Sequence, residues 1–192
     1  MCDERGVEPV TLAEACLRGG ARLLQLRWKG APGGAFLSLA ELIVARAREC
    51  GAAVIINDRP DIARLASADG VHVGQDDLSV DDVRQVAGAD AIVGLSTHDE
   101  RQVDAALAGR ATYVAVGPIF STTTKPAGAP RGLGLLHYAS GRGKPVVAIG
   151  GITLERVRSV IAAGASGVAI ITDLLATGDP ETRVRAYLQN FA

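Results

Sequence analysis

A regular alternation of short apolar runs and amphipathic helical patterns limits most strongly how this chain can fold. The runs rich in β-branched residues indicate seven buried strands, at 21–27, 52–57, 70–73, 91–96, 113–117, 145–150 and 167–171. The helical patterns lie at 11–17, 37–50, 61–67, 79–87, 100–108, 134–139, 154–163 and 181–191. Strands that alternate with helices pair in parallel, so the sequence predicts an α/β protein.

The number of strands bears on which α/β architecture is expected. A closed parallel barrel needs eight strands, whereas an open doubly wound sheet tolerates other numbers, and periodicity alone permits both. The regular spacing favours a TIM-type (β/α)8 barrel whose first β-strand is missing or truncated at the N-terminus, with Met1 to Asp3 as its last residues. A length of 192 residues suits one hydrophobic core, so we expect a single domain over 1–192.

Charge and cysteine content exclude several classes of protein. The chain has 20 Lys and Arg against 21 Asp and Glu, which gives no general field to attract nucleic acid or an anionic membrane. Its three cysteines are widely spaced and form no CxxC motif, so neither a disulfide framework nor a zinc site is indicated. With a polar N-terminus and no long apolar run, the sequence predicts a cytoplasmic protein without nucleic-acid or membrane partners.

Polar or glycine residues follow the C-terminal end of nearly every predicted strand. In chain order they are Gln25, Arg27 and Lys29; Asn57 and Asp58; Gly74, Gln75, Asp76 and Asp77; Ser96, Thr97 and His98; Gly117; Gly150 and Gly151; and Thr172 and Asp173. In a parallel barrel these strand ends share one rim, and active sites are built there. We therefore expect these scattered groups to converge on one site.

Two of these clusters suggest a site for phosphate and metal. Gln25, Arg27 and Lys29 are spaced by two, so in an extended segment they project on one side and can hold a phosphate, or they are ordinary surface charges. Asn57, Asp58 and Asp77 offer hard oxygen ligands of the kind that bind Mg²⁺. The alternatives are a helix cap for Asp58 and a turn residue for Asp77.

The remaining polar residues have less certain roles. We expect Asp76 to face solvent and His72, inside an apolar strand, to be a hydrogen-bonded core residue, whereas His98 lies near the rim or only begins a helix. Ser79 and Thr153 are expected at helix starts.

The segment 118–132 is long for a strand-to-helix connection and is either a binding loop or a plain surface loop. Thr122, Thr124 and Lys125 in this segment could contact phosphate oxygens. The glycines at 150 and 151 permit either close approach of the backbone to a phosphate or simply a tight turn.

Six blocks in this order resemble the thiamine-phosphate synthase family from Gly20 to Ile171. The matching residues are Gln25, Arg27 and Lys29; Ile56, Asn57 and Asp58; Gly74, Gln75 and Asp77; Gly94, Ser96 and His98; Gly117 to Phe120 with Thr122, Thr124 and Lys125; and Ala148 to Ile152. The resemblance implies an enzyme that transfers the aminomethyl-pyrimidine group from its diphosphate to a thiazole phosphate, releasing pyrophosphate.

The resemblance also implies a role for each matched residue. The pyrimidine diphosphate would be held by Gln25, Arg27, Lys29, Asn57, Ser96 and Lys125, of which Arg27, Ser96 and Lys125 would be catalytic. The thiazole phosphate would be held by Thr122, Thr124, Gly151, Ile171 and Thr172, the last of which stands where the family has serine. Asp58 and Asp77 would bind Mg²⁺, and a homo-oligomer is in keeping with the family.

This set of residues contains cations, hydroxyls and a metal site, and we expect no nucleophile paired with a base. Such a set suits departure of a diphosphate followed by attack of the thiazole nitrogen. One alternative is a thiazole tautomerase-like relative, although Pro118 occupies the place of its rim histidine. The other is a non-catalytic phosphate-binding barrel.

Overall fold

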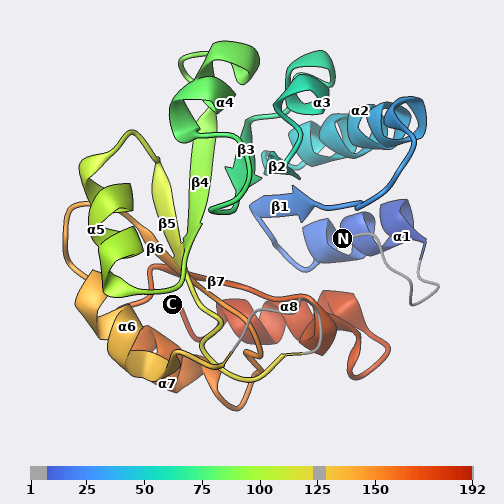
Figure 1. Cartoon of the computed structure of the whole chain (residues 1–192). Coiled ribbons are helices and arrows are strands. Elements are labelled where there is room, and N and C mark those ends of the chain that lie inside the picture. The colour runs from blue at the N-terminus through green and yellow to red at the C-terminus, as the bar shows by residue number, and fades with distance from the viewer. Residues whose placement is uncertain (1–7, 123–128, 192) are drawn as a thin grey trace.

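The computed structural model describes residues 8–122 and 129–191, and its seven strands form one parallel sheet in which each strand pairs with the next along the chain (Figure 1). The strands are β1 (Leu23–Leu26), β2 (Ala53–Asn57), β3 (Gly70–Val73), β4 (Ile92–Thr97), β5 (Tyr113–Val116), β6 (Val146–Ile149) and β7 (Gly167–Ala169). All seven predicted strands are confirmed: β3 has the predicted bounds, β4 is shifted by one residue, and the other five are slightly shorter.

Eight α-helices cover the outer face of the curled sheet (Figure 1). They are α1 (Pro9–Arg18), α2 (Gly33–Glu49), α3 (Pro60–Leu65), α4 (Val80–Ala87), α5 (Glu100–Ala108), α6 (Gly132–Ala139), α7 (Val157–Ala162) and α8 (Pro180–Leu188), with a short 3-10 helix, η1 (Thr172–Leu175), after β7. The eight predicted helices are therefore confirmed. Within the described ranges, none of them has the length and apolar character that a membrane crossing requires.

The two predicted helix starts have different outcomes. The Ser79 side chain accepts a hydrogen bond from the Asp82 backbone N–H at 3.2 Å and caps α4, as predicted. The expectation for Thr153 is wrong, because α7 begins only at Val157. A turn precedes that helix, in which the Arg156 N–H donates to the Thr153 carbonyl at 3.0 Å.

The core explains why the strands are apolar on both faces. Every residue of β3 and β5 is buried, as expected for parallel strands between helices and a filled interior. The buried apolar side chains form two clusters, one beneath the first four helices and the other beneath α5, α6 and α7. Phe36 of α2 and Leu136 of α6, both almost fully buried, lie in the first and second cluster respectively.

The sheet curls without closing through hydrogen bonds in the part of the chain that the structure describes. β1 and β7 are its two edges, and no ladder joins them within residues 8–122 and 129–191. Apolar side chains at these edges are exposed, with Leu23 of β1 at 51% and Ile171 just after β7 at 43%. Helix packing joins the two sides, since a Cβ on Gly19, at the end of α1, would lie 2.7 Å from the Glu181 carbonyl oxygen of α8.

A buried ion pair anchors α8 to the loops at the strand ends. The Arg183 guanidinium donates to both carboxylate oxygens of Asp173 at 2.9 Å, and the two side chains are only 13% and 10% exposed. Asp173 also accepts hydrogen bonds from the Leu154 backbone N–H at 3.2 Å and from the Tyr187 hydroxyl. One carboxylate thus connects β7, α8 and the segment after β6.

Removal of this anchor should destabilise the protein strongly. We predict that Arg183→Met lowers the free energy of unfolding by about 3 kcal/mol or more, because the buried Asp173 carboxylate loses its charged partner. Arg185→Met is the matched control, since Arg185 pairs with Glu181 while 54% exposed, and it should cost about 1 kcal/mol or less. Urea denaturation measures both, and equal effects would contradict the assignment.

Candidate functional site

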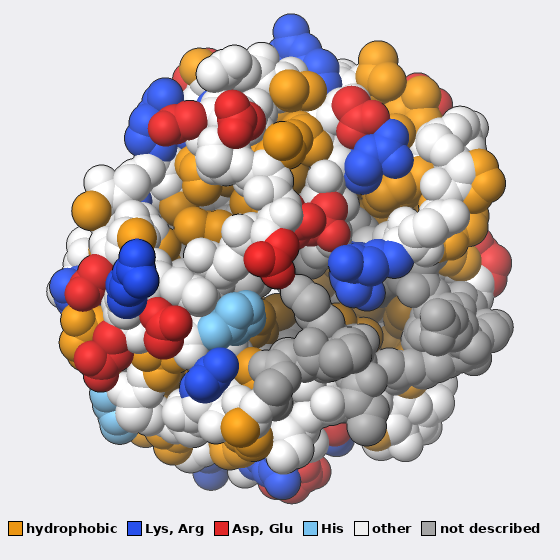
Figure 2. Space-filling view, in the orientation of Figure 1, with side chains coloured by type: hydrophobic (Ala, Val, Ile, Leu, Met, Phe, Trp, Pro, Cys, Tyr) orange, Lys and Arg blue, Asp and Glu red, His pale blue; other side chains and the backbone are white. Residues whose placement is uncertain are grey.

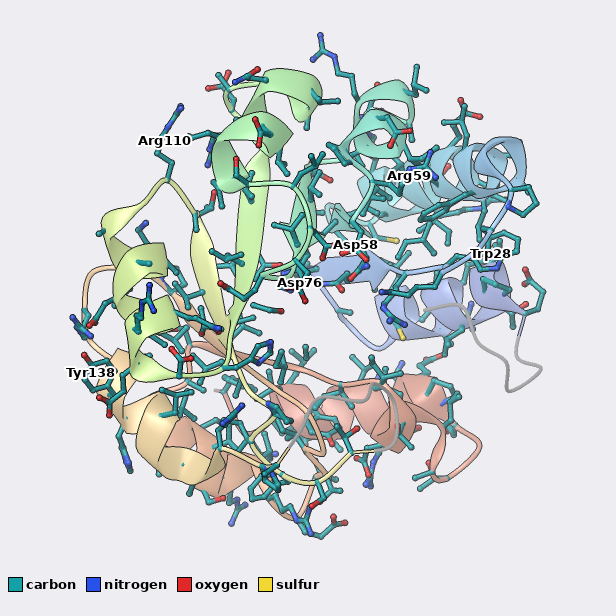
Figure 3. All side chains as sticks on the ribbon, viewed as in Figure 1. Trp28, Asp58, Arg59, Asp76, Arg110 and Tyr138 are labelled. Atoms are coloured by element: carbon teal, nitrogen blue, oxygen red, sulfur yellow. The ribbon has the colours of Figure 1, made fainter. Side chains whose placement is uncertain are left out.

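The predicted polar residues of the first strands converge at the C-terminal end of the sheet. Figure 2 shows acidic and basic side chains beside one another near the centre of this view, where Figure 3 labels Asp58 and Asp76. Trp28 and Arg59 lie farther out in Figure 3, toward α2. The parallel register brings these residues together, because all the strands end on the same side.

Asp58 occupies a strained place directly after β2. Its φ of 62° lies in the left-handed region, which a residue with a side chain rarely adopts, and its N–H donates to the His72 carbonyl of β3 at 2.9 Å. The suggested role as a helix cap is wrong, because α3 begins after Arg59 and has no side-chain cap. Backbone strain that serves no cap is typical of a functional position.

The Asp58 carboxyl lies between like and unlike charges. Burial raises its pKa, a hydrogen bond and the charge of Asp77 raise it further, and the cations Lys29 and Arg27 counteract these effects in part. The Lys29 ammonium is 3.7 Å from an Asp58 oxygen. Asp77 is also a turn residue, the alternative considered for it, since its carboxylate accepts a hydrogen bond from the Gly74 N–H at 2.8 Å.

The chemistry of this acidic pair fits a divalent cation that also binds phosphate. The described residues contain no group of three or more His, Cys, Asp or Glu side chains arranged for a metal, so the protein itself offers two carboxylates here. Mg²⁺ is commonly held in this way, by one or two carboxylates with the remaining positions filled by water and substrate phosphates. The repulsion within the pair is what a bound cation would relieve.

A hollow of about 200 Å³ adjoins Asp58. Its lining includes Lys29, Asn57 and Asp58, together with the aromatic pair Trp28 and Phe36, whose ring centroids are 6.4 Å apart. The Lys29 side chain is 59% exposed, so it is also a surface charge, the alternative considered for it. A cation, an amide and a carboxylate nevertheless share the wall of one cavity.

Ser96 and His72 are in direct contact beneath the rim. The His72 Nε2 lies 2.8 Å from the Ser96 Oγ, and His72 Nδ1 lies 2.9 Å from the Tyr113 hydroxyl. His72 is therefore a hydrogen-bonded core residue, as predicted. The contact of Ser96 with an imidazole was not predicted, because parallel pairing of β3 with β4 brings together two residues 24 positions apart.

The structure shows why the two positions after β6 are glycine. Gly150 and Gly151 have φ of 89° and 63°, and a Cβ on Gly151 would lie 2.4 Å from the Ser121 carbonyl oxygen. The loops after β5 and β6 are thus in close backbone contact. Arg156 stabilises this contact, since it donates to the Gly151 carbonyl at 3.1 Å and lies 4.7 Å from the centroid of the Phe120 ring.

The other predicted phosphate residues are divided between described and undescribed segments. Thr122 follows β5, while Ile171 and Thr172 follow β7, so all three belong to loops at the same end of the sheet. Thr124 and Lys125 lie outside the described residues. Asp76 is exposed, as predicted, and His98 bonds the Gly117 carbonyl through Nδ1 at 2.5 Å, which joins the ends of β4 and β5.

Tyr113 and Arg156 support the site but were not predicted to do so, and Gln75 was placed at the strand ends without a partner. Tyr113 hydrogen-bonds His72, the Gln75 amide donates to the Ser96 carbonyl at 2.7 Å, and Arg156 joins two loops. A lone tyrosine in an apolar strand is a recognisable signal, because a buried phenol needs a polar partner. The partner itself could not be inferred without the strand register.

Comparison with known proteins gives a consistent result. A model of the family described as thiamine monophosphate synthase matches residues 2–174. A thiamine-phosphate synthase of Roseiflexus castenholzii is 44% identical over 92% of this chain and 78% of its own, and one of Anaeromyxobacter dehalogenans is 46% identical over 92% and 80%. The solved thiamine phosphate pyrophosphorylase of Pyrococcus furiosus has a TM-score of 0.91 at 28% identity, over 98% of this chain and 91% of that one.

The charge balance at Asp58 predicts a pH-dependent stability. Because the folded pKa of Asp58 is raised above its ordinary value of 3.8, stability falls as pH rises from that value through the folded pKa. Asp58→Asn should abolish this fall and be more stable than the wild type at neutral pH without divalent cations. Urea denaturation across a pH series measures the difference, which should vanish below the ordinary pKa.

Asp61→Asn provides a control of opposite sign. A hydrogen bond from Arg59 lowers the pKa of Asp61, so the ionised Asp61 carboxylate stabilises the fold at pH values above its ordinary pKa. Replacement of Asp61 by Asn should therefore not increase stability at neutral pH. An Asp58→Asn protein no more stable than the wild type at neutral pH would contradict the charge balance described for Asp58.

Proposed function

Because the chain belongs to the thiamine monophosphate synthase family, we propose that this site transfers a 4-amino-2-methylpyrimidin-5-ylmethyl group from its diphosphate to a thiazole phosphate. The products are thiamine phosphate and pyrophosphate, and the reaction belongs to thiamine biosynthesis. The observation that carries the assignment of the site is the contact of Lys29 with Asp58, itself hydrogen-bonded to Asp77, at the rim of the parallel sheet. We place this reaction in the cytoplasm.

The residues on β1, β2 and β4 would hold the pyrimidine diphosphate. Lys29 lines the same hollow as Asn57, an amide that can donate to a phosphate oxygen, and Arg27 adds a second positive charge close enough to act on Asp58. Gln25 would lie close to the diphosphate, Ser96 would lie next to both the pyrimidine and the diphosphate, and Lys125 would add a third cation. A diphosphate needs such a concentration of donors because its charge grows as it leaves.

Asp58 and Asp77 would hold Mg²⁺ beside the diphosphate. The cation, when bound, supplies positive charge to the leaving group. The side chains of Arg27 and Lys29 would add to this charge and orient the leaving oxygens. The charge of Asp77 raises the pKa of Asp58, and this repulsion between the two carboxylates supports the assignment. Groups with a perturbed pKa are common at functional sites.

The loops after β5, β6 and β7 would bind the thiazole phosphate. Thr122, Thr124 and Thr172 offer hydroxyls, and Gly151 and Ile171 offer backbone N–H groups. The threonine at 172 keeps the hydroxyl of the expected serine but adds a methyl group that restricts its rotamer. Anchoring of the neighbouring Asp173 by Arg183 supports a fixed geometry for this loop.

The reaction then needs positioning more than acid–base chemistry. The C–O bond between the exocyclic methylene and the diphosphate breaks, and its electron pair leaves on the diphosphate oxygen. The thiazole nitrogen donates its lone pair to the methylene carbon to form the new C–N bond. The protein holds the two partners in line and stabilises the departing charge, so a covalent enzyme intermediate is unnecessary.

The direct test is an assay with both substrates. With the pyrimidine diphosphate, thiazole phosphate and Mg²⁺, we expect equal amounts of thiamine phosphate and pyrophosphate to form. Removal of the divalent cation with a chelator should abolish turnover. A folded protein that forms neither product would exclude the synthase function, and turnover that is independent of a divalent cation would exclude the metal site.

Variants of the acidic pair refine this assay. Asp58→Ala and Asp77→Ala should each lower turnover by at least about 100-fold at limiting Mg²⁺, in the range expected when a group that stabilises transition-state charge is lost. Asp61→Ala, with an exposed carboxylate next to the site, is the matched control and should retain activity. Excess Mg²⁺ should rescue the two site variants only in part.

We also propose that an additional strand completes a (β/α)8 barrel between β1 and β7. The exposed apolar side chains Leu23 and Ile171 at these edges support this proposal. A fused N-terminal segment of alternating apolar residues that reaches the gap should raise the melting temperature and protect the β1 amides from hydrogen exchange. A polar segment of equal length is the control, and equal stability of the two fusions would contradict closure by a strand.

A further inference from the structure

A layer of ring-bearing side chains lies inside the curled sheet, directly below the rim. His72, Gly94 and Tyr113 are register partners on β3, β4 and β5, and the two rings are stacked with centroids 5.7 Å apart. A Cβ on Gly94 would lie 2.1 Å from the Tyr113 Cζ and 2.6 Å from the His72 Nδ1. Only a residue without a side chain leaves room for this contact.

Hydrogen bonds join four side chains of this interior in series. The Gln25 side chain bonds the Tyr113 hydroxyl, which is 2.9 Å from His72 Nδ1, and His72 Nε2 is 2.8 Å from the Ser96 Oγ. Tyr113, His72 and Ser96 are only 7–8% exposed. The series runs from the interior to Ser96, near the end of β4.

Two opposite directions of these hydrogen bonds satisfy the partners, and the Gln25 contact favours one of them. A neutral imidazole has one donor and one acceptor, so the bonds on its two sides must run the same way. The Gln25 contact counteracts part of the rise that burial causes in the Tyr113 pKa, which is the effect of an amide N–H that donates to the phenol oxygen, and burial keeps the phenol protonated. The phenol O–H therefore donates to His72 Nδ1, and His72 Nε2–H donates to the Ser96 Oγ.

This direction determines what Ser96 can offer a ligand. Its oxygen already accepts a hydrogen bond from His72, so its own hydrogen can be directed to an acceptor. Asn57, which would bind the diphosphate, is the register partner of His72 on β2, so a single strand, β3, separates its strand from β4, which carries Ser96. Resting on the proposed function, we propose that His72 and Tyr113 are positioning residues that hold the Ser96 hydroxyl as a donor toward the leaving diphosphate.

The same contact in the reverse direction would make His72 a general base for a nucleophilic serine. That arrangement requires the hydrogen on Nδ1, with Nε2 as the acceptor. The Nδ1 neighbour is the Tyr113 phenol rather than a carboxylate, so the usual group that stabilises a charged imidazole does not occupy that position. The two mechanisms differ in which nitrogen of His72 carries the hydrogen.

Nitrogen NMR of the whole protein distinguishes these tautomers without substrate. The chain has three histidines, so His72→Gln, His98→Gln and His137→Gln assign every signal. We expect His72 to be neutral and protonated at Nε2 near pH 7. Protonation at Nδ1, or a doubly protonated ring, would overturn the proposal. Because no turnover is involved, this result is independent of the synthase assay.

Single-turnover kinetics test whether the relay acts through Ser96. His72→Leu should lower the rate of the chemical step by about 100-fold and Tyr113→Phe by about 10-fold, the scale of losing or misaligning one donor. His72→Gln should recover most of the loss, because an amide N–H can reach the Ser96 oxygen. The KM for thiazole phosphate should be unchanged in all three.

A double-mutant cycle and surface controls complete the test. In a Ser96→Ala background, His72→Leu should cause no further loss, because the residue acts only through the missing hydroxyl. His137→Gln and Tyr138→Phe, which alter an exposed histidine and a surface tyrosine, should have wild-type rates. A full additional loss in the Ser96→Ala background, in protein of wild-type melting temperature, would overturn the relay.

Discussion

Parallel pairing of consecutive strands is the constraint on which the rest of this structure depends. Seven strands pair in the order in which they occur, so every strand ends on one side of the curled sheet. Side chains from distant parts of the sequence therefore meet there. Asp58 after β2 and Asp77 after β3 come into hydrogen-bonding range in this way, close to Lys29 after β1. The sheet thus positions the loops that follow its strands, and those loops carry the charged side chains of the site.

The site places charges where folding alone would not favour them. Asp58 combines a left-handed backbone with a partly buried carboxylate beside a second carboxylate, and each feature costs stability. Elsewhere the structure satisfies its buried charge, as Asp173 shows by accepting from Arg183, Tyr187 and a backbone N–H. The contrast between these two aspartates separates a residue that stabilises the fold from one suited to bind a ligand.

Glycine determines how closely the functional groups approach. At Gly94 the missing side chain allows His72 and Tyr113 to stack and hydrogen-bond, and at Gly151 it allows two loops to touch. These contacts fix the surroundings of Ser96 and of the loop after β6. The precision of the site therefore comes from backbone proximity inside the curled sheet as well as from the charged side chains at its rim.

The sequence by itself determined the strands, the helices and the composition of the rim, because buried strands and amphipathic helices have local patterns and polar residues at strand ends are visible in one dimension. It also predicted His72 as a core residue. Only the tertiary structure decided that His72 touches Ser96 and Tyr113, that Asp58 is strained rather than a cap, and that Gly151 is crowded by Ser121. These relations depend on register and curvature across neighbouring strands, which no local pattern encodes.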